Sequence, residues 1–381
     1  MTGDKIPQRK ISVCQPYLGG REMEYVTEAL KDGWISSSGK YVTAFEEEFA
    51  KYCGVCHGIA ACNGTVAIHL ALVALGIKSG DEVIIPSFTM IATAAAVVYT
   101  GAKPVFVDAD PLTWNIDVNK IEEKLTSKTK AIMPVSIFGN PCQMDEIRLL
   151  ARKHGLSVIE DGAESHGAEY KGKKVGSLSD ITAFSFFANK NLTTGEGGMV
   201  VTDDENLAQK CRYFKNLCFP LMGPRNYVHE DIGFNYRMSN LHAAIGLAQV
   251  EKADEYRKMR MHNADLYKQF LADVPGIVFQ KDTQDSKNVH WMNSILLDPK
   301  KIGRNRDQLI EYLRSKGIES RRLFVGMHHQ PCLSKAGCDV SGQYPVTENL
   351  TENGLYLPSA SNLLEEDIRY ICEQILGGLH V

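Results

Sequence analysis

Lys190 is the residue whose neighbours most strongly suggest chemistry. It lies in FFANKNLTTGEGG, residues 186–198, where an apolar, strand-like run is followed by Gly195, Gly197 and Gly198. A lysine amine acts as a nucleophile when it is held deprotonated, and glycine lets the backbone turn close to a ligand. A lone lysine beside glycines is more often a solvated surface residue. The interpretation therefore depends on which other residues can reach Lys190.

Several polar or aromatic residues stand at or just after the ends of strand-like runs. In an open α/β sheet, ligands bind in the crevice beyond the carboxyl ends of the strands, so we expect these side chains near Lys190. Asn63, Gly64 and Thr65 also stand at the start of a predicted buried helix, where backbone N–H groups bind anions such as phosphate. The residues are Asn63, Gly64, Thr65, Phe88, Asp161 and Ser185.

This set matches the needs of pyridoxal 5′-phosphate (PLP). That cofactor requires a lysine for its aldehyde, a carboxylate that keeps its pyridine nitrogen protonated, a phosphate cradle and a flat apolar partner for its ring. Each residue alone has a plainer interpretation. Asn63 and Thr65 can cap a helix, Asp161 can form a turn, and Phe88 can belong to the core. Their joint occurrence favours the cofactor site.

The elements that must position these residues form an α/β pattern. From residue 57 to about 200, short apolar runs alternate with helical patterns, which is typical of a sheet covered on both faces. The runs are HGIAAC, DEVIIP, KPVFVDAD, AIMPVSIFG, LSVIEDG, ITAFSFF and GGMVVTDD. We therefore expect a large α/β domain.

A second unit is predicted in the C-terminal third. One long helix is expected from Ser239, a suitable N-cap, to about Val274, where it carries the chain out of the first domain. The remainder contains the strand-like WMNSILL and the helical RDQLIEYLRSKG and LEEDIRYICEQIL, which fit a smaller α+β domain. We predict a large domain at residues 1–255 and a small domain at residues 256–381.

Composition excludes several classes of protein. The 381-residue chain has a net charge of −4 with both signs mixed, so it lacks the basic surface of a nucleic-acid-binding protein. No apolar run reaches the roughly 18 residues of a membrane helix. The start, MTGDKIPQRK, leads into no apolar core, which predicts no signal peptide and a cytoplasmic protein.

The ten cysteines are scattered, and most are expected to be buried thiols in a reducing compartment. CGVCH, residues 53–57, matches the pattern of covalent haem attachment. That attachment normally needs export, and the flanking FEEEFAKYC and GIAAC indicate an ordinary helix-to-strand corner. A zinc site would need a second cysteine pair. We predict no metal site.

Six blocks of sequence resemble the DegT/DnrJ/EryC1/StrS family of PLP-dependent nucleotide-sugar aminotransferases. They are WISSSGKYVTAFEEEFA, NGTVAIHLAL, GDEVIIPSFT, VIEDGAESHG, FFANKNLTTGEGGMVV and GFNYRMSNLHAAIGLAQ, and the most specific parts are NKNLTTGEGG and GFNYRMS. The resemblance covers nearly the whole chain. It implies the aspartate-aminotransferase fold (PLP fold type I), in which a large domain with a mostly parallel sheet precedes a smaller α+β domain.

The resemblance implies roles for the residues around Lys190. Lys190 would join the cofactor and, once freed, move a proton between the cofactor and the donor Cα or the sugar C4. Asp161 would pair with the pyridinium nitrogen, and Phe88 would stack on the ring. The resemblance also places Glu164 near the cofactor hydroxyl, where relatives often have Gln or His. Lys190 also favours transamination, because some relatives that carry histidine at this position are dehydratases.

The resemblance further implies a phosphate site shared between two subunits. Gly64, Thr65 and Ser185 would bind the phosphate, and Asn235 of GFNYRM would reach it from the neighbouring subunit. This implies a homodimer with its sites at the interface. Asn235 alone could instead be a structural turn residue.

Within the family, TTGEGG and DGWISSSGKY imply glutamate-dependent amination of GDP-4-keto-6-deoxy-D-mannose, a step in lipopolysaccharide O-antigen biosynthesis. The segment RRLFVGMHHQP differs from the related enzymes of this specificity near the expected substrate pocket. UDP- or dTDP-linked 4-keto-6-deoxy sugars therefore remain alternative substrates. A PLP-dependent dehydratase and a non-catalytic protein on the same fold are alternative functions. Arg321 and Arg322 in this segment could bind a diphosphate, or they could be solvated charges at a helix end. Candidate substrate contacts are Trp34, Ser36, Arg321, Arg322 and His328.

Overall fold

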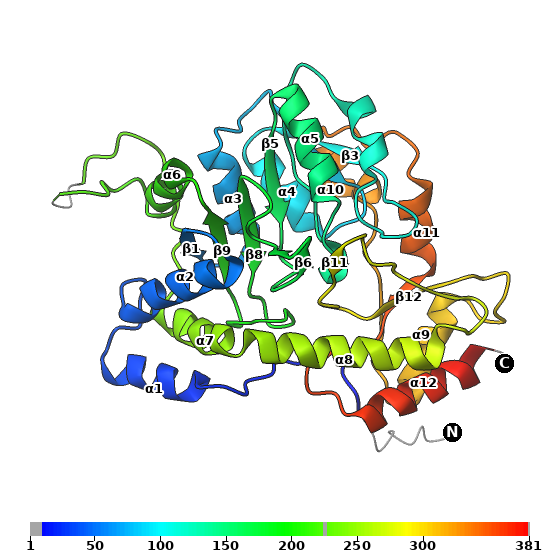
Figure 1. The fold of residues 1–381 in the computed structure, drawn as a ribbon. Coiled ribbons are helices and arrows are strands. Elements are labelled where there is room, and N and C mark those ends of the chain that lie inside the picture. The colour runs from blue at the N-terminus through cyan, green and yellow to red at the C-terminus, as the bar shows by residue number, and fades with distance from the viewer. Residues whose placement is uncertain (1–9, 224–226, 380–381) are drawn as a thin grey trace.

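The computed structural model describes residues 10–223 and 227–379. Residues 1–9, which carry most of the segment used to predict the absence of a signal peptide, lie outside this range. Within the described residues, the largest sheet has the strand order β1-β9-β8-β5-β4-β2-β3 and lies at the centre of the upper part of Figure 1. Its strands are β1 (His57–Ala61), β2 (Glu82–Pro86), β3 (Lys103–Val107), β4 (Thr129–Ile132), β5 (Ser157–Asp161), β8 (Ile181–Ser185) and β9 (Gly198–Thr202).

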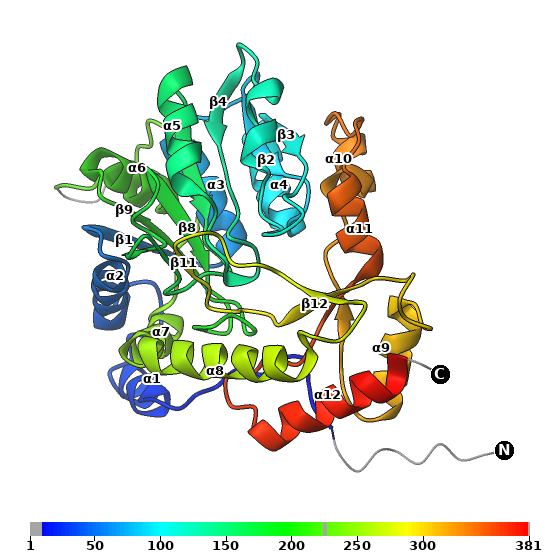
Figure 2. The ribbon, with the colours of Figure 1, turned by 45° about the vertical axis from the view of Figure 1, so that its right-hand side comes forward.

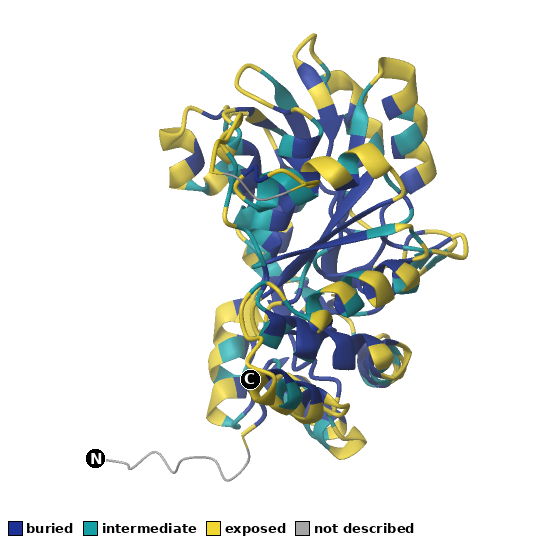
Figure 3. Ribbon diagram, turned by 90° about the vertical axis from the view of Figure 1, so that its left-hand side faces the viewer, coloured by how far each residue is buried: buried dark blue, intermediate teal, exposed yellow. Residues whose placement is uncertain are grey.

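Each strand of this sheet comes from one of the apolar runs recognised in the sequence. Neighbouring strands are parallel except at β9, which is antiparallel to both β1 and β8. The predicted mostly parallel sheet is therefore confirmed. Side chains alternate between the two faces: Ile84 packs into one core cluster, whereas Val83 and Ile85 pack into another. The sheet is thus buried on both faces, and Figure 3 shows its strands in dark blue.

Two groups of helices cover these faces. Helices α2, α5 and α7 pack on the Ile84 side, with α1 against α7, and helices α3, α4 and α6 pack on the opposite side. GTVAIHLALVALG forms α3, and QMDEIRLLARKHG forms α5, whose C-cap Gly155 lies in the left-handed region (φ 66°). The bounds are α1 (Glu22–Lys31), α2 (Lys40–Cys53), α3 (Gly64–Ala74), α4 (Ile91–Tyr99), α5 (Met144–His154), α6 (Glu205–Lys215) and α7 (Asn240–Glu251).

The single long helix expected from Ser239 to Val274 is wrong, because the structure has two helices there. Ser239 does cap α7, since its Oγ accepts from the His242 N–H. The chain then leaves helical geometry at Lys252 (φ −111°, ψ 8°) before α8 (Ala253–Leu271) begins. Neither glycine nor proline stands at this break, so no local signal marks it. Helix α8 runs below the large sheet towards the C-terminal part (Figures 1 and 2).

The C-terminal part contains an antiparallel sheet of order β10-β12-β14-β13, which packs with α8, α9 and α12. The end of WMNSILL forms β12, and the two predicted helices are α9 and α12. The predicted domain division after residue 255 falls in the first turn of α8 and stays a prediction. The bounds are β10 (Ile277–Phe279), β12 (Ser294–Leu297), β13 (Arg321–Arg322), β14 (Gly354–Tyr356), α9 (Arg306–Ser315) and α12 (Glu365–Leu379).

One C-terminal segment returns to the large sheet. Met327 and Leu333 pack in the same core cluster as α3 and α4, and the Met327 N–H donates to the carbonyl of Ser87, which follows β2. Figure 2 shows α10 and α11 on the side of α4 and β3. The remaining elements are η4 (Met327–His329), α10 (Pro331–Lys335), α11 (Pro345–Asn353), β6 (Glu169–Tyr170), β7 (Lys173–Lys174), β11 (Ser286–Lys287), η1 (Val118–Lys120), η2 (Glu122–Lys124) and η3 (Ile137–Gly139).

The CGVCH segment is the predicted helix-to-strand corner. Helix α2 ends at Cys53, Gly54 adopts the left-handed conformation (φ 79°), and β1 begins at His57. All ten cysteines are unpaired, and six of them are buried. Among the described residues, every helix is too short or too polar to span a bilayer.

Candidate active site

A cavity of about 610 Å³ opens beside the carboxyl ends of the central strands. Asp161 is the last residue of β5, Ser185 is the last of β8, and Gly64 is the first of α3. The residues singled out in the sequence that line this cavity are Asn63, Gly64, Thr65, Asp161, Glu164, Ser185, Lys190 and Arg321.

The start of α3 lies directly against the end of β8. Asn63 caps the helix, because its Oδ1 accepts from the Val66 N–H at 3.0 Å. A Cβ on Gly64 would stand 2.5 Å from the Ser185 Cβ, so only glycine permits this approach. The first N–H groups of a helix have no partner within the helix, and they carry its positive end. Gly64, Thr65 and Ser185 therefore surround a site suited to an anion such as phosphate.

Asp161 is a buried carboxylate with oriented donors. Its Oδ2 accepts from Thr93 Oγ1 at 2.8 Å, and its Oδ1 accepts from the Ala163 N–H at 3.2 Å. Burial raises the pKa of Asp161, and the bonds from Thr93 and Ala163 and the nearby Lys190 oppose that rise. A cation in the cavity would complete the stabilisation of its charged form.

Lys190 and Glu164 form a buried pair. Lys190 Nζ lies 3.8 Å from Glu164 Oε1, and the side chains are only 10% and 4% exposed. Glu164 Oε2 is fixed by the Phe138 N–H at 2.8 Å. Burial lowers the pKa of Lys190 against the opposing charges of Glu164 and Asp161, and burial raises the pKa of Glu164 against Lys190. Burial therefore favours a neutral Lys190 amine, the form that can accept a proton.

Trp291, which the sequence interpretation treated only as part of a strand-like run, positions this lysine. Its ring centroid lies 3.6 Å from Lys190 Nζ, and its indole N–H donates to the Asn189 carbonyl at 2.8 Å. The indole thus holds both the lysine side chain and the backbone next to it. Only the path of the chain through the C-terminal part brings residue 291 to residue 190.

Thr93 and Tyr356 were also missed. Thr93 could have been found, because it lies in the first turn of the helix that follows β2, at the same strand ends as the other site residues. Tyr356 lines the cavity from β14 and is 7% exposed, and among the described residues its hydroxyl has no hydrogen-bond partner. No local pattern marks it.

Phe88 does not line the cavity. Its ring is fully buried and packs near Phe138 and Phe324, with centroid distances of 5.9 and 6.0 Å. Met90, two residues further on, does line the cavity and is 47% exposed. Thr89 and Met90 both line the cavity whereas the Phe88 ring is packed in the core, so the geometry favours Met90 over Phe88 as the neighbour of a bound ring.

The two adjacent arginines of β13 face different surroundings. Arg321 lines the cavity together with Tyr356, its cross-strand partner, and its guanidinium bonds Glu319 at 2.6 Å. Arg322 points to α9, where it makes two bonds to the Asp307 carboxylate at 2.9 and 2.6 Å. The alternation of a strand therefore leaves only Arg321 available to a ligand in the cavity.

A model of the DegT/DnrJ/EryC1/StrS aminotransferase family matches residues 16–376. The chain belongs to this family.

Its relatives within this aminotransferase family include GDP-perosamine synthases of three bacteria. The enzyme of Escherichia coli O157:H7 is 47% identical over 365 residues, which cover 96% of this chain and 97% of the relative. The enzyme of Caulobacter vibrioides is 47% identical over 361 residues, covering 94% and 95%. The enzyme of Vibrio cholerae is 39% identical over 365 residues, covering 96% and 98%.

Solved structures of aminotransferases share the fold. The aminotransferase from Psychrobacter cryohalolentis has a TM-score of 0.90 and 33% identity, and the match covers 95% of this chain and 97% of that one. DesI, solved in the presence of its TDP-sugar product, has a TM-score of 0.89 and 33% identity over 97% and 93%. These likenesses confirm the aspartate-aminotransferase fold predicted from the sequence.

Besides Phe88 and Arg322, four further predicted contacts of this aminotransferase lie outside the cavity of its own chain. Trp34 is 61% exposed, and Ser36 and Asn235 are also exposed. The loop that carries Trp34 and Ser36 is bound to the start of α7, because the Asn240 backbone N–H donates to the Ser36 carbonyl and its side chain donates to the Trp34 carbonyl. The fourth residue, His328, lies beside the end of β2.

Proposed function

We propose that this aminotransferase uses PLP and glutamate to convert GDP-4-keto-6-deoxy-D-mannose into GDP-perosamine. The observation that carries the proposal is the buried Lys190, which shares one cavity with Asp161 and the start of α3. The choice of sugar is supported by the 47% identity with two GDP-perosamine synthases over nearly the full chain.

The residues of the cavity fit PLP. Gly64 leaves room above Ser185 that a Cβ would fill, so a phosphate can approach the start of α3. Asp161 offers a carboxylate for a protonated ring nitrogen, and Lys190 offers an amine for the aldehyde. When bound, PLP supplies an electron sink that stabilises negative charge on the carbon from which a proton is removed.

Lys190 is the proposed proton carrier. In the first half of the reaction its neutral Nζ would take a proton from the Cα of glutamate and pass it to the cofactor, and in the second half it would take a proton from the cofactor and pass it to C4 of the sugar. Glu164, 3.8 Å away, would stabilise the ammonium between the two proton transfers of each half. The bonds from Thr93 and the Ala163 N–H favour the ionised form of Asp161, and Trp291 holds the lysine side chain over the cavity.

Arg321 is the proposed contact for an anionic part of the substrates, because it lines the cavity and a guanidinium binds phosphate or carboxylate through two parallel bonds. Arg322 is already bonded to Asp307, and His328 lies outside the cavity lining. Their predicted substrate contacts therefore have no support from the geometry.

We also propose that the active form is a homodimer. Trp34, Ser36 and Asn235 are exposed and do not line the cavity of their own chain, so their predicted contacts would be made in the cavity of a second copy. The loop before Asn235 also exposes several large apolar side chains, which a partner would cover. These are Leu217, Leu221, Met222, Tyr227, Val228 and Ile232. The cytoplasmic location stays a prediction.

The test is a product assay by mass spectrometry. The chain is supplied with PLP, glutamate labelled in its amino nitrogen, and GDP-, UDP- or dTDP-linked 4-keto-6-deoxy sugars. Labelled nitrogen in the GDP sugar is the expected result. Labelled nitrogen only in a UDP or dTDP sugar would contradict the proposed substrate but support the proposed amino transfer. Loss of water without transfer of nitrogen would indicate a dehydratase.

A further inference from the structure

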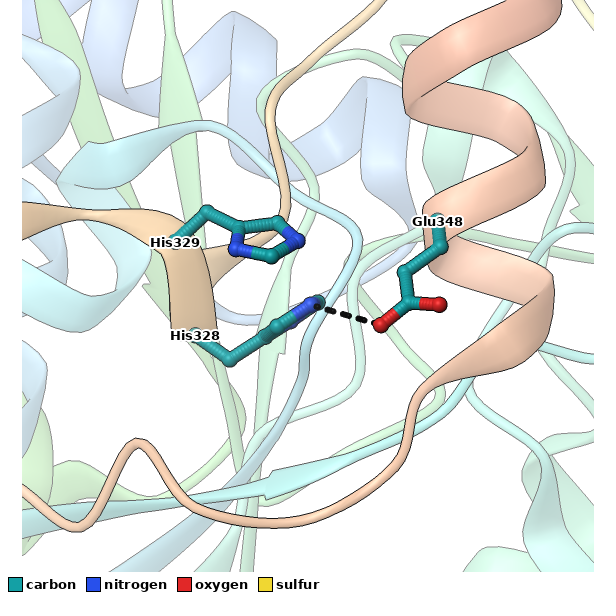
Figure 4. A group of neighbouring side chains, drawn as sticks. All are labelled: His328, His329 and Glu348. Carbon is teal, nitrogen blue, oxygen red and sulfur yellow. Dashed lines mark ion pairs between the residues drawn. The ribbon is translucent and has the colours of Figure 1, made fainter.

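His328, His329 and Glu348 gather outside the cavity that Lys190 lines. The histidines belong to η4 and Glu348 to α11, and their ligand atoms lie within 4.8 Å of one another. Figure 4 shows both imidazole rings pointing towards Glu348. The proposed amino transfer assigns no role to this cluster.

His328 is held rigidly within the cluster. Its side chain is 5% exposed, and its ring stacks on Tyr344 with the centroids 4.5 Å apart. Nδ1 lies 2.7 Å from Ser87 Oγ, and Nε2 lies 3.7 Å from Glu348 Oε1. Among the described residues, Nε2 is a buried atom without a hydrogen bond. The ring therefore presents one buried, unbonded nitrogen to a carboxylate.

This arrangement suits a bound cation. Ser87 Oγ can accept a hydrogen bond from the Nδ1–H group, which leaves the Nε2 lone pair facing Glu348. Such an acceptor behind the ring is what orients most metal-binding histidines. A cation between Nε2 and the carboxylate would satisfy both groups.

We propose that His328, His329 and Glu348 bind a divalent transition metal of the zinc type. Two histidines and one glutamate are a donor set used for zinc, with a fourth position left to water. Imidazole ligands favour zinc, copper and nickel over magnesium or calcium. The inference does not depend on the proposed amino transfer.

The required movement is small. Tetrahedral zinc with bonds of about 2.0–2.1 Å places its ligand atoms about 3.4 Å apart, so distances between ligand atoms that are now within 4.8 Å must contract by up to about 1.4 Å. His329 is exposed and the Glu348 side chain is 47% exposed, so both can rotate while His328 stays fixed. The metal would link η4 to α11, and the hydrogen bond between His328 and Ser87 would connect both to the end of β2.

The experiment is a Zn²⁺ titration of the PLP-loaded full chain after treatment with a chelator. Bound metal is measured by equilibrium dialysis, and the midpoint of thermal unfolding is followed in parallel. The exposed Cys56 and Cys332 are replaced by serine in every sample, because thiolates also bind zinc. We expect about one Zn²⁺ per chain and a higher unfolding temperature with the metal.

Matched variants locate the site. His329→Ala and Glu348→Gln should weaken Zn²⁺ binding at least tenfold, and Ser87→Ala should weaken it about tenfold by freeing the ring. His262→Ala removes an exposed histidine of α8 and should leave binding unchanged. Absence of saturable binding in the parent chain, or equal affinity in His329→Ala, Glu348→Gln and His262→Ala, would overturn the proposal.

Discussion

The amine of Lys190 lies over the indole of Trp291, with Nζ 3.6 Å from the ring centroid. The same indole donates to the carbonyl of Asn189, the residue before the lysine. One side chain thus constrains both the backbone and the reactive end of Lys190. Because the contact joins residues 101 positions apart (291 minus 190), it depends on the folded chain.

Replacing Trp291 should slow the reaction without abolishing it. When Lys190 carries the transferred proton, its ammonium makes a cation–π contact with Trp291 worth about 0.5–2 kcal/mol, which corresponds to roughly 2- to 30-fold in rate. We expect Trp291→Leu to lower kcat within that range with little change in KM for the sugar. Trp291→Phe keeps an aromatic face and should lose less. Equal losses in both variants would show that the ring face contributes nothing.

Lys190→Ala should remove turnover while leaving the fold intact. General acid–base catalysis contributes about 10²–10⁴-fold, and the variant also lacks the amine that joins the cofactor. Lys190→Arg is the control for charge, because a guanidinium stays protonated and cannot accept the proton. Turnover is measured as labelled amino nitrogen transferred from glutamate to the sugar, and PLP binding is measured by dialysis. Normal multiple turnover by Lys190→Ala would refute the assigned role.

Gly64→Ala should weaken PLP binding. The new Cβ would stand 2.5 Å from the Ser185 Cβ, so the start of α3 must move away from β8. Overpacking costs about 1–3 kcal/mol, equivalent to roughly 5- to 150-fold in affinity. Gly377→Ala is the control: it lies inside α12 with its nearest neighbour at 3.5 Å, and it should stabilise the fold by about 0.5–1 kcal/mol. Similar PLP affinity in both variants would contradict the proposed phosphate site.

Glu164→Gln should shift the pH dependence of PLP uptake by the cofactor-free chain. Uptake needs the neutral Lys190 amine, so its rate rises with pH through the pKa of Lys190. Burial lowers that pKa and Glu164 raises it, so removing the Glu164 charge should move the profile to lower pH. Glu196→Gln, another carboxylate of the cavity lining, is the matched control. A profile that moves to higher pH would show that the pair is wrongly assigned.

Glu160→Gln should stabilise the fold at neutral and alkaline pH. Glu160 is fully buried and accepts from Ser136 Oγ at 2.8 Å, and burial raises its pKa from 4.5 to about 7. Between pH values near 4.5 and near 7 the unfolded chain binds fewer protons at Glu160 than the folded chain does. The free energy of unfolding therefore falls as pH rises through this range, by up to about 3 kcal/mol. Glutamine keeps the acceptor without the charge. Urea unfolding below and above this window measures the effect, and an equal gain at both pH values would contradict the mechanism.

Local sequence determined the large sheet and the centre of the site. Each apolar run bounded by Gly, Pro or Asp became a strand, because strand formation and burial on both faces depend on residues close together in the chain. The rule that ligands meet strand ends then selected Gly64, Asp161, Ser185 and Lys190, which line one cavity. Gly64 stands where the start of α3 approaches β8 closely, a position that leaves few alternatives to glycine.

Tertiary structure alone decided which C-terminal residues reach the cavity, where the Phe88 ring lies and where the helix after Ser239 breaks. Trp291 and Tyr356 reach the cavity from the C-terminal part, Phe88 turns into the core, and the helix expected after Ser239 breaks at Lys252. These outcomes depend on contacts between distant segments, and no local period or spacing encodes them. Side-chain direction on a strand likewise depends on register, so adjacent residues such as the two arginines of β13 meet a ligand cavity and a helix respectively.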